Sequence, residues 1–196
     1  MEKGWSLFMD RDGVVNEQII GGYVMEAEQF VFHNGVFEAL EILHQHFDRV
    51  LLVTNQQCVG KGLCSMDKID RVHEWMQQQL VARNIAFDRI YCCPHLAAVG
   101  CDCRKPKPGM AHQAELDFPE IDFAKSIMVG DSLSDIQFAV NAGMRPVHVG
   151  AVRHPEFEEI QKLTLLHYDS LFEFAQSLGN SKFQVSGSRF QEESTK

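Results

Sequence analysis

The sequence predicts an α/β fold with a mostly parallel central sheet and helices on both of its faces. Short apolar runs alternate along the chain with segments that carry apolar residues at helical spacing. Strands and helices that alternate in this way favour a parallel sheet that is covered on both sides. Polar residues gather where several apolar runs end, and in such sheets binding sites form beyond the carboxyl ends of the strands.

Five apolar runs have the length and composition of strands that are buried on both faces. They are residues 5–9 (WSLFM), 50–54 (VLLVT), 89–92 (RIYC), 126–129 (SIMV) and 146–149 (PVHV). Two stretches between them each carry one apolar stripe at the spacing of an α-helix. The stripes consist of Val36, Leu40, Leu43 and Phe47, and of Ile69, Val72, Met76 and Leu80.

Two further units complete the predicted order of elements. A helix is expected from about Ser132 to Gly143, because glycine suits the left-handed residue that ends many helices. The segment from Arg153 to Leu178 is predicted to form a last strand and helix. Its inward-facing residues would be Leu171, Phe174 and Leu178.

Size and composition fit one domain with a substantial core. The chain has 196 residues, of which 45% are hydrophobic. We expect a single domain over residues 1–178, in a monomeric protein. Residues 179–196 are rich in serine, glutamine and charge, and we expect them to form a disordered tail.

Charge and targeting signals argue against several classes of partner. The formal net charge of −9 disfavours nucleic acid and anionic membranes. No apolar segment approaches the roughly 20 residues that cross a bilayer, and the N-terminus lacks the apolar run of a signal peptide. We therefore expect a cytoplasmic protein whose six cysteines are reduced.

The most informative motif is Asp10-Arg11-Asp12-Gly13, which follows the first predicted strand. Residues two apart in extended backbone project to the same side, so Asp10 and Asp12 can face one site while Arg11 turns away. Two carboxylates this close repel each other unless a cation lies between them. Hard oxygen ligands at a loop suit Mg²⁺. A simple turn at the strand end is the alternative.

Other polar groups are predicted at the same edge of the sheet. Thr54, Asn55 and Gln56 end the second strand and can donate hydrogen bonds to an anion. Asp131 follows the fourth strand and can supply a third carboxylate to the cation. Asp135 lies four residues further on; it either faces the metal or only stabilises the start of a helix, and both readings stay open.

A cluster of soft ligands lies between the third and fourth predicted strands. It consists of Cys93, His95, Cys101 and Cys103. Three thiolates and one imidazole at this spacing fit a closed, tetrahedral and therefore structural Zn²⁺ site within a loop of about residues 92–106. Cys92 competes with Cys93 as a ligand, and a redox-active cysteine pair is the alternative function of the cluster.

Two cations follow this cluster directly. Arg104 and Lys105 come immediately after Cys103 in a proline-containing segment, so a metal-bound loop would fix the direction of both side chains. A buried lysine near carboxylates and a phosphate would neutralise the charge that develops in phosphoryl transfer.

In this order, Asp-x-Asp-Gly, a strand-ending threonine, Lys-Pro and Gly-Asp-x-x-x-Asp resemble the motifs of the haloacid dehalogenase (HAD) superfamily of phosphohydrolases. The resemblance runs from about Leu7 to Gly150. The Cys/His loop is similar to that of the zinc-containing branch, which holds the D-glycero-D-manno-heptose 1,7-bisphosphate 7-phosphatases and the histidinol-phosphate phosphatases. The resemblance implies a three-layer Rossmann-like fold without a cap domain, catalytic Mg²⁺ and structural Zn²⁺.

The resemblance also implies roles for individual residues. Asp10 would attack phosphorus and form an aspartyl-phosphate, and Asp12 would act first as general acid and then as general base. Asp10, Asp131 and the backbone carbonyl of Asp12 would hold Mg²⁺, while Thr54 and Lys105 would steady the phosphoryl oxygens. The residues expected to contact the sugar phosphate are Gly22, Tyr23, Asn55, Gln56, Gln57, Lys61 and Arg104.

The leading hypothesis is therefore a Mg²⁺-dependent phosphatase that acts on a small phosphorylated sugar. The specific expectation is removal of the 7-phosphate of D-glycero-D-manno-heptose 1,7-bisphosphate. Gly22-Tyr23-Val24 and Gly60-Lys61-Gly62 resemble the heptose enzymes, whereas the short Cys/His loop resembles the histidinol-phosphate enzymes. The alternative with the same chemistry is therefore a histidinol-phosphate phosphatase. A rival of another class is a signalling receiver domain with a long-lived phospho-aspartate, against which the second carboxylate, Asp12, counts. A metal-storage or redox module would leave the three carboxylates without a role.

Overall fold

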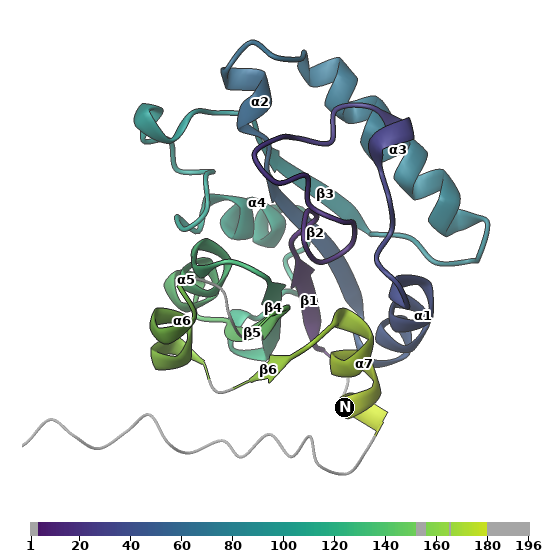
Figure 1. Ribbon diagram of the computed structural model, residues 1–196. Helices are drawn as coiled ribbons and strands as arrows, with labels where there is room; N and C mark the ends of the chain where they lie inside the picture. Colours follow the sequence, from purple (N-terminus) through teal and green to yellow (C-terminus); the bar gives the residue numbers. More distant parts are fainter. Residues whose placement is uncertain (1–3, 152–155, 165, 180–196) are drawn as a thin grey trace, which may run out of the picture.

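The computed structural model describes residues 4–151, 156–164 and 166–179. Within these residues the chain forms a six-stranded sheet in the order β3-β2-β1-β4-β5-β6, and every neighbouring pair is parallel (Figure 1). The strands are β1 (Ser6–Met9), β2 (Arg49–Asn55), β3 (Arg89–Cys93), β4 (Ser126–Gly130), β5 (Arg145–Val149) and β6 (His167–Tyr168). The predicted α/β fold class is confirmed.

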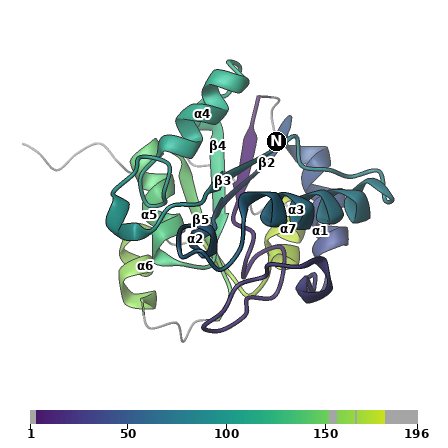
Figure 2. The same ribbon diagram turned by 90° about the horizontal axis from the view of Figure 1, so that it is seen from above.

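Helices cover both faces of the sheet, as Figures 1 and 2 show. One face is covered by α1 (Val36–His46), α3 (Met66–Val81) and α7 (Leu171–Gly179), and the other by α4 (Gly109–Asp117) and α5 (Leu133–Ala142). The short helix α2 (Gln57–Gly60) follows β2, and α6 (Phe157–Leu163) packs beside α5. Three single-turn 3₁₀ helices span Ala27–Gln29, Ala97–Val99 and Phe123–Lys125.

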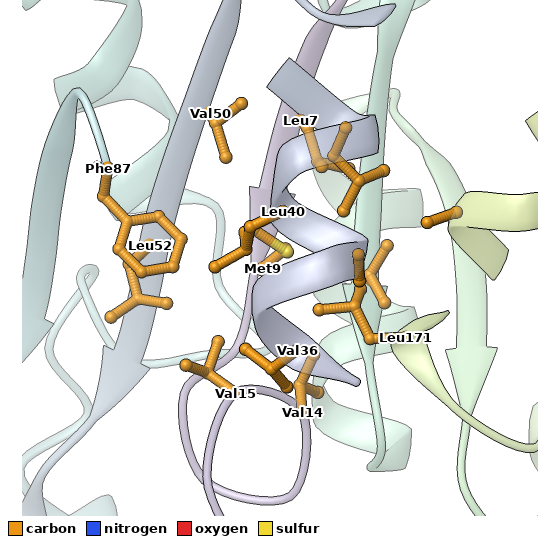
Figure 3. Close-up of a cluster of buried hydrophobic side chains, with 14 of the residues drawn as sticks. Leu7, Met9, Val14, Val15, Val36, Leu40, Val50, Leu52, Phe87 and Leu171 are labelled. Atoms are coloured by element: carbon orange, nitrogen blue, oxygen red, sulfur yellow. The ribbon is translucent and has the colours of Figure 1, made fainter. Parts of the chain in front are cut away.

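After Ser6, the first strand is apolar at every position because both of its faces are buried. Leu7 and Met9 belong to the core under α1, α3 and α7, whereas Phe8 belongs to the core under α4 and α5. Figure 3 shows Leu7 and Met9 beside Val36 and Leu40 of α1. A strand in the centre of a doubly covered parallel sheet has no polar face, which is why its sequence does not alternate.

The two predicted apolar stripes form the buried sides of α1 and α3. Seven of the eight stripe residues lie within these helices and are buried, and Phe47 is the buried residue that ends α1. The third predicted helix is α5, which begins after Ser132 and ends at Gly143 with φ at 78°. A positive φ costs glycine little, so this residue ends the helix without steric strain.

Besides the single-turn helix α2, two helices were not predicted, because their sequences carry too few apolar residues to form a stripe. The helix α4 buries only Met110, Ala111 and Ala114, and α6 buries only Ile160. The last unit therefore contains α6 before β6 and α7, rather than one strand and one helix. Leu171 and Phe174 are buried as expected, and Leu178 is partly buried.

Predictions about the ends of the chain fall largely on residues that the structure does not describe. The tail predicted over 179–196 lies outside them except for its first residue, Gly179, which ends α7. The single domain over residues 1–178 stays a prediction. None of the helices in the described part of the chain has the length and apolar character that a membrane crossing needs.

The order of the strands determines where a site can form. β1 lies between β2 and β4 in the sheet. The strands β2 and β3 continue the sheet on one side of β1, and β4, β5 and β6 continue it on the other, so the strand order reverses direction at β1. A crevice opens beyond the carboxyl ends of the strands at such a switch point. Asp10 directly follows β1, Thr54 lies near the end of β2, and Asp131 directly follows β4.

We expect Leu40→Ala to lower the free energy of unfolding by about 2–5 kcal/mol, because it leaves a cavity in the core of Figure 3. The control is Leu116→Ala in α4, since Leu116 is 81% exposed; it should change the free energy by less than about 0.5 kcal/mol. Urea unfolding of the three proteins measures both values. Equal losses would contradict the packing of α1 on the sheet.

Candidate active site

A cavity of about 210 Å³ lies beyond the carboxyl ends of β1, β2 and β4. Its wall includes most of the residues predicted to form a site, although they come from five separate segments of the chain. They are Asp10, Asp12, Gly22, Tyr23, Thr54, Asn55, Gln57, Arg104, Lys105 and Asp131. The structure therefore brings the nucleophile candidate, the acid–base candidate and the loop cations to one place.

The Lys105 side chain lies at the floor of this site and is only 1% exposed. Its Nζ atom is 2.7 Å from Asp10 Oδ1 and 2.6 Å from Asp135 Oδ1, and it donates a hydrogen bond to the backbone oxygen of Val53 at 2.8 Å. Burial alone would lower the pKa of Lys105, but the charges of Asp10 and Asp135 outweigh it and raise the pKa. The ammonium group therefore stays charged.

Asp135 stabilises the start of α5, which is one of its two predicted roles, and it also pairs with Lys105, which was not predicted. Its Oδ2 atom accepts hydrogen bonds from Ser132 N at 3.1 Å and Ser132 Oγ at 2.6 Å, which closes a capping box at the start of α5. Its other oxygen pairs with Lys105. Gly130 leaves room for this fully buried carboxylate, because a Cβ atom at position 130 would lie 2.1 Å from Asp135 Cβ.

Three carboxylates lie close together beside β4, and two of them, Asp10 and Asp131, line the cavity. Asp10, Asp131 and Asp135 each offer an oxygen, and these atoms lie within 4.8 Å of one another. Gly13, with φ at 92°, lets the loop approach closely, because a Cβ atom there would lie 2.0 Å from Asp131 Oδ2. A cluster of acidic oxygens at a loop fits a hard divalent cation such as Mg²⁺.

The protonation of two of these carboxyl groups reflects the crowding. Burial raises the pKa of Asp10 to about 7, against the opposing charge of Lys105. Burial, and then the charges of Asp135 and Asp10, raise the pKa of Asp131 to about 8. A bound cation would favour the ionised form of both groups, so the site has the charge that a divalent metal needs.

As strand alternation predicts, Arg11 does not line the cavity, but its long side chain still contacts the site at Asp12. Its side chain is fully buried, and its Nη2 atom donates to both carboxylate oxygens of Asp12, at 3.0 and 2.9 Å. Asn16 Nδ2 donates to Oδ1 at 2.9 Å and Gln56 Nε2 donates to Oδ2 at 2.8 Å. Alternation sets only the direction of Cβ; the long arginine side chain folds back underneath its neighbour.

This environment has the opposite effect on Asp12. Burial would raise the pKa of Asp12, but the charge of Arg11 and the hydrogen bonds from Asn16, Arg11 and Gln56 lower it below the ordinary value. The neighbouring carboxyl groups therefore differ: Asp10 is raised by burial, whereas Asp12 is held as an anion by its donors. Carboxyl groups whose pKa values are pushed apart are typical of acid–base sites.

His73 of α3 completes the surroundings of Arg11. Its Nε2 atom lies 3.1 Å from Arg11 Nη1. Burial and the charge of Arg11 lower the pKa of His73 to about 3, so the ring is neutral and Nε2 accepts the hydrogen bond from arginine. Sequence reasoning missed Arg11, Asn16 and His73. One signal was available, because His73 adjoins Val72 on the apolar stripe of α3.

The predicted residues Thr54, Asn55 and Gln56, at and just after the end of β2, support the site in different ways. Thr54 is buried, and its Oγ1 atom accepts a hydrogen bond from Gln56 Nε2 at 2.9 Å. Asn55 bonds the backbone of Lys105 through both amide atoms, at 3.1 and 3.3 Å. Gln56 is buried and joins Asp12 to Thr54, rather than lining the cavity. These contacts attach the Lys105 loop and Asp12 to the end of one strand.

Two cations lie near the mouth of the cavity. Arg104 lines it, and Arg104 Nη1 donates to the backbone oxygen of His95 at 3.3 Å. Lys61 lies outside the cavity wall, where its Nζ atom donates to Tyr23 Oη at 2.8 Å and is 5.2 Å from the centroid of the tyrosine ring. Tyr23 itself lines the cavity, so Lys61 is one side chain away from it.

The predicted soft-ligand cluster is assembled in the loop after β3. The Sγ atom of Cys103 is 3.0 Å from that of Cys93 and 3.4 Å from that of Cys101, and Cys93 and Cys101 are 3.6 Å apart. His95 Nδ1 is 3.2 Å from Cys103 Sγ and 3.7 Å from Cys93 Sγ. Tetrahedral Zn²⁺ with bonds of about 2.3 Å would hold its ligands about 3.8 Å apart. The four residues therefore fit this metal, with only a small expansion.

The sequence is similar to known phosphatases over most of its length. A HAD-hydrolase-like family model matches residues 102–164. A Mycobacterium bovis protein named D-glycero-alpha-D-manno-heptose-1,7-bisphosphate 7-phosphatase is 36% identical over 183 residues, which cover 91% of this chain and 93% of the relative. A Vibrio cholerae protein named as the 7-phosphatase of the beta anomer is 38% identical over 173 residues, which cover 85% and 91%.

The fold is also similar to a solved phosphatase structure. The D,D-heptose 1,7-bisphosphate phosphatase from B. bronchiseptica, in complex with magnesium and phosphate, superposes with a TM-score of 0.77 at 29% sequence identity. The match covers 89% of this chain and 97% of that chain.

The raised pKa values of Asp10 and Asp131 predict a pH-dependent stability in the absence of magnesium. Their ordinary pKa is 3.8, so between about pH 4 and pH 8 the folded chain binds more protons than the unfolded chain. Their contribution to stability therefore falls as pH rises through this range. Relative to the wild type, Asp131→Asn should therefore have a higher free energy of unfolding at pH 8 than at pH 5.5, by on the order of 1 kcal/mol or more.

Urea unfolding in magnesium-free buffer at the two pH values measures this difference. Asp67→Asn, at an exposed position of α3, is the control and should show no comparable dependence on pH. An Asp131→Asn effect that is equal at pH 5.5 and pH 8 would contradict the crowded carboxylate site.

Proposed function

Because the chain belongs to the family of the heptose-1,7-bisphosphate 7-phosphatases within the HAD-like hydrolases, we propose that it removes the 7-phosphate of D-glycero-D-manno-heptose 1,7-bisphosphate. It is a phosphoric monoester hydrolase, and a small phosphorylated sugar is its substrate. The observation that carries the proposal is the convergence of Asp10, Asp131 and Lys105 at the floor of one cavity.

Asp10 is the proposed nucleophile. It lies directly after the central strand, and its Oδ1 atom is held by the ammonium group of Lys105 and by the backbone N–H of Arg11, both at 2.7 Å. These contacts fix the carboxylate in one orientation. Attack on phosphorus would give an aspartyl-phosphate and divide hydrolysis into two displacements, which is ordinary covalent catalysis by a carboxylate.

Asp12 is the proposed acid and base. Its carboxylate lines the same cavity and is 22% exposed, although its donors are buried. In the first displacement it would protonate the departing sugar oxygen, and in the second it would remove a proton from the attacking water. Its low pKa in the free protein favours the second role.

The transferred phosphoryl group would be surrounded by donors and cations. Lys105 offers a charge that is fixed by two carboxylates, and Thr54 offers a hydroxyl group from the end of β2. Asp10 and Asp131, with the backbone carbonyl of Asp12 as the family resemblance implies, would hold Mg²⁺, which when bound offsets the negative charge of the phosphoryl group. Fixed charges of this kind need no reorganisation during the reaction.

The rest of the substrate would lie toward the mouth of the cavity. Gly22, Tyr23, Asn55 and Gln57 line the wall there, and Arg104 supplies a cation. Lys61 does not line the cavity itself. It would act on the sugar phosphate indirectly, by holding the Tyr23 side chain in the cavity wall. A substrate with a second phosphate suits a cavity that carries positive charge at both ends.

Zn²⁺ is the proposed occupant of the cluster formed by Cys93, His95, Cys101 and Cys103, with a structural role. The cluster is joined to the cavity by chain connectivity, because Arg104 and Lys105 follow Cys103, and by the hydrogen bond from Arg104 to His95. The metal would thus orient the loop cations without taking part in the chemistry.

The proposed substrate is tested by steady-state assays of the purified protein with Mg²⁺. The panel contains the alpha and beta anomers of heptose 1,7-bisphosphate, fructose 1,6-bisphosphate and histidinol phosphate. We expect the highest kcat/KM for a heptose bisphosphate, and no multiple turnover by Asp10→Asn. A higher kcat/KM for histidinol phosphate would show that the proposed substrate is wrong. Multiple turnover by Asp10→Asn would show that Asp10 is not the nucleophile.

Asp12→Asn should lower kcat by about 10²-fold or more, the usual contribution of a positioned acid or base. The amide cannot exchange a proton with the sugar oxygen or with water. The fold is checked by urea unfolding, and Asp67→Asn serves as the exposed control. A near-normal kcat for Asp12→Asn would remove Asp12 from the reaction.

Removal of zinc should lower activity, because Arg104 and Lys105 would lose their fixed direction. We expect protein treated with a strong chelator and resupplied with Mg²⁺ to be largely inactive, and added Zn²⁺ to restore its activity. Cys101→Ser should behave like the treated protein, whereas Cys64→Ser, outside the cluster, should not. Full turnover of zinc-free protein would show that the cluster does not support the site.

A further inference from the structure

We propose that Arg11 and His73 are positioning residues that fix the orientation of the Asp12 carboxylate, and that they connect α3 to the acid–base step. The inference rests on the proposed function and assigns to the same site two residues that do not line its cavity. Neither residue would touch the substrate. Both would act through Asp12.

The contacts of Asp12 leave its carboxylate little freedom to rotate. Oδ1 accepts hydrogen bonds from Arg11 Nη2 at 3.0 Å and Asn16 Nδ2 at 2.9 Å. Oδ2 accepts from Arg11 Nη2 at 2.9 Å and Gln56 Nε2 at 2.8 Å. Any rotation about the bond to the carboxylate would lengthen several of these bonds together. The plane of the acid–base group is thus set by three side chains.

Each of these donors is itself held by a different part of the chain. Asn16 also donates to the backbone oxygen of Glu17, and Gln56 also donates to Thr54. Arg11 is held from α3, because its Nη1 atom donates to His73 Nε2 at 3.1 Å. His73 is therefore the anchor that the helix contributes to the arrangement.

Because Arg11 is buried, its ion pair with Asp12 cannot be broken without a large energetic cost. The arginine side chain is fully buried and is paired with Asp12 at 2.9 Å. A buried charge whose partner is removed is strongly unfavourable, so the guanidinium group and the carboxylate must stay together. Lysine could not replace it, because a single ammonium group at the end of a flexible chain cannot bond Asp12 and His73 in the fixed geometry of the guanidinium plane.

The geometry points to a role in catalysis as well as in folding. The contacts run from His73 through Arg11 to Asp12, and of these three residues only Asp12 lines the cavity. Arg11 and His73 are buried, whereas the Asp12 side chain is 22% exposed and lines the cavity. A proton donor must lie within hydrogen-bond reach of the atom it protonates. Small rotations of Asp12 would therefore affect proton transfer before they affected substrate binding.

The reaction steps make this consequence specific. In the first step the bond from Asp10 to phosphorus forms, the bond from phosphorus to the sugar oxygen breaks, and the Asp12 proton goes to that oxygen. In the second step a water oxygen bonds phosphorus, its proton goes to Asp12, and the bond from phosphorus to Asp10 breaks. A misplaced Asp12 slows both steps for a sugar ester. With 4-nitrophenyl phosphate the first step needs no proton, because 4-nitrophenolate leaves as an anion.

The experiment measures kcat and KM on the sugar phosphate and the first-turnover rate on 4-nitrophenyl phosphate for four variants. Arg11→Met should lower kcat by about 10²-fold, and His73→Leu by about tenfold through the loss of one hydrogen bond to a charged group. KM should change little in both. The first turnover with 4-nitrophenyl phosphate should stay close to the wild-type rate.

The other two variants separate geometry from charge and bulk. His73→Gln keeps an acceptor for Arg11 and should recover most of the activity that His73→Leu loses. Arg11→Lys keeps the charge but should stay impaired, because it lacks the planar pair of donors. The controls are Arg83→Met and His112→Gln, two exposed positions outside the site, which should leave every rate unchanged.

The outcomes distinguish this inference from the proposed function. Absence of phosphate release by the wild-type protein would reject the proposed function itself. An active wild type with normal kcat in His73→Leu and Arg11→Met would overturn the positioning role. So would an equal loss on both substrates, which indicates general disruption. If Arg11→Met does not fold, the comparison of His73→Leu with His73→Gln decides, since equal activities in that pair would overturn the inference.

Discussion

The ion pairs of Lys105 are the interaction on which the site depends. One buried ammonium group joins Asp10 after β1, Asp135 in α5 and the backbone of Val53 in β2. Without this charge, buried carboxylates would face each other with no counter-ion, which is strongly unfavourable in a protein interior. The lysine therefore stabilises the junction of three elements and also orients the carboxylate that is proposed to attack phosphorus.

The cavity combines two opposite electrostatic environments. On the side of β4, burial and like charges raise the pKa of Asp10 and Asp131, and a divalent cation would relieve this cost. On the side of α3, the charge and hydrogen bonds of Arg11 and the hydrogen bonds of two amides, Asn16 and Gln56, lower the pKa of Asp12. The same motif can thus supply a metal-binding nucleophile and an acid–base group, because each carboxylate has its own set of neighbours.

The sequence was sufficient for the sheet and for the residues at its carboxyl edge, because both follow from local patterns. Buried strands have continuous apolar runs, and polar residues directly after them must lie at the site. Weakly apolar α4 and α6 escaped prediction, since a helix with few buried side chains has no stripe to detect. Arg11 stays out of the cavity wall as predicted, but its contact with Asp12 was missed, because alternation describes where a side chain starts and not where a long one ends. The role of Asp135 depended on Lys105, which is thirty residues earlier in the chain and meets it only in the folded protein.

The role of Asp10 is tested most directly by identifying the residue that carries the phosphoryl group during turnover. Substrate labelled with radioactive phosphorus is mixed with the enzyme, the reaction is stopped with acid, and the protein is cleaved and mapped. If Asp10 is the nucleophile, the label will be found on the peptide that contains Asp10, at that residue. Label on a different residue, or an active enzyme that never carries label, would contradict this role.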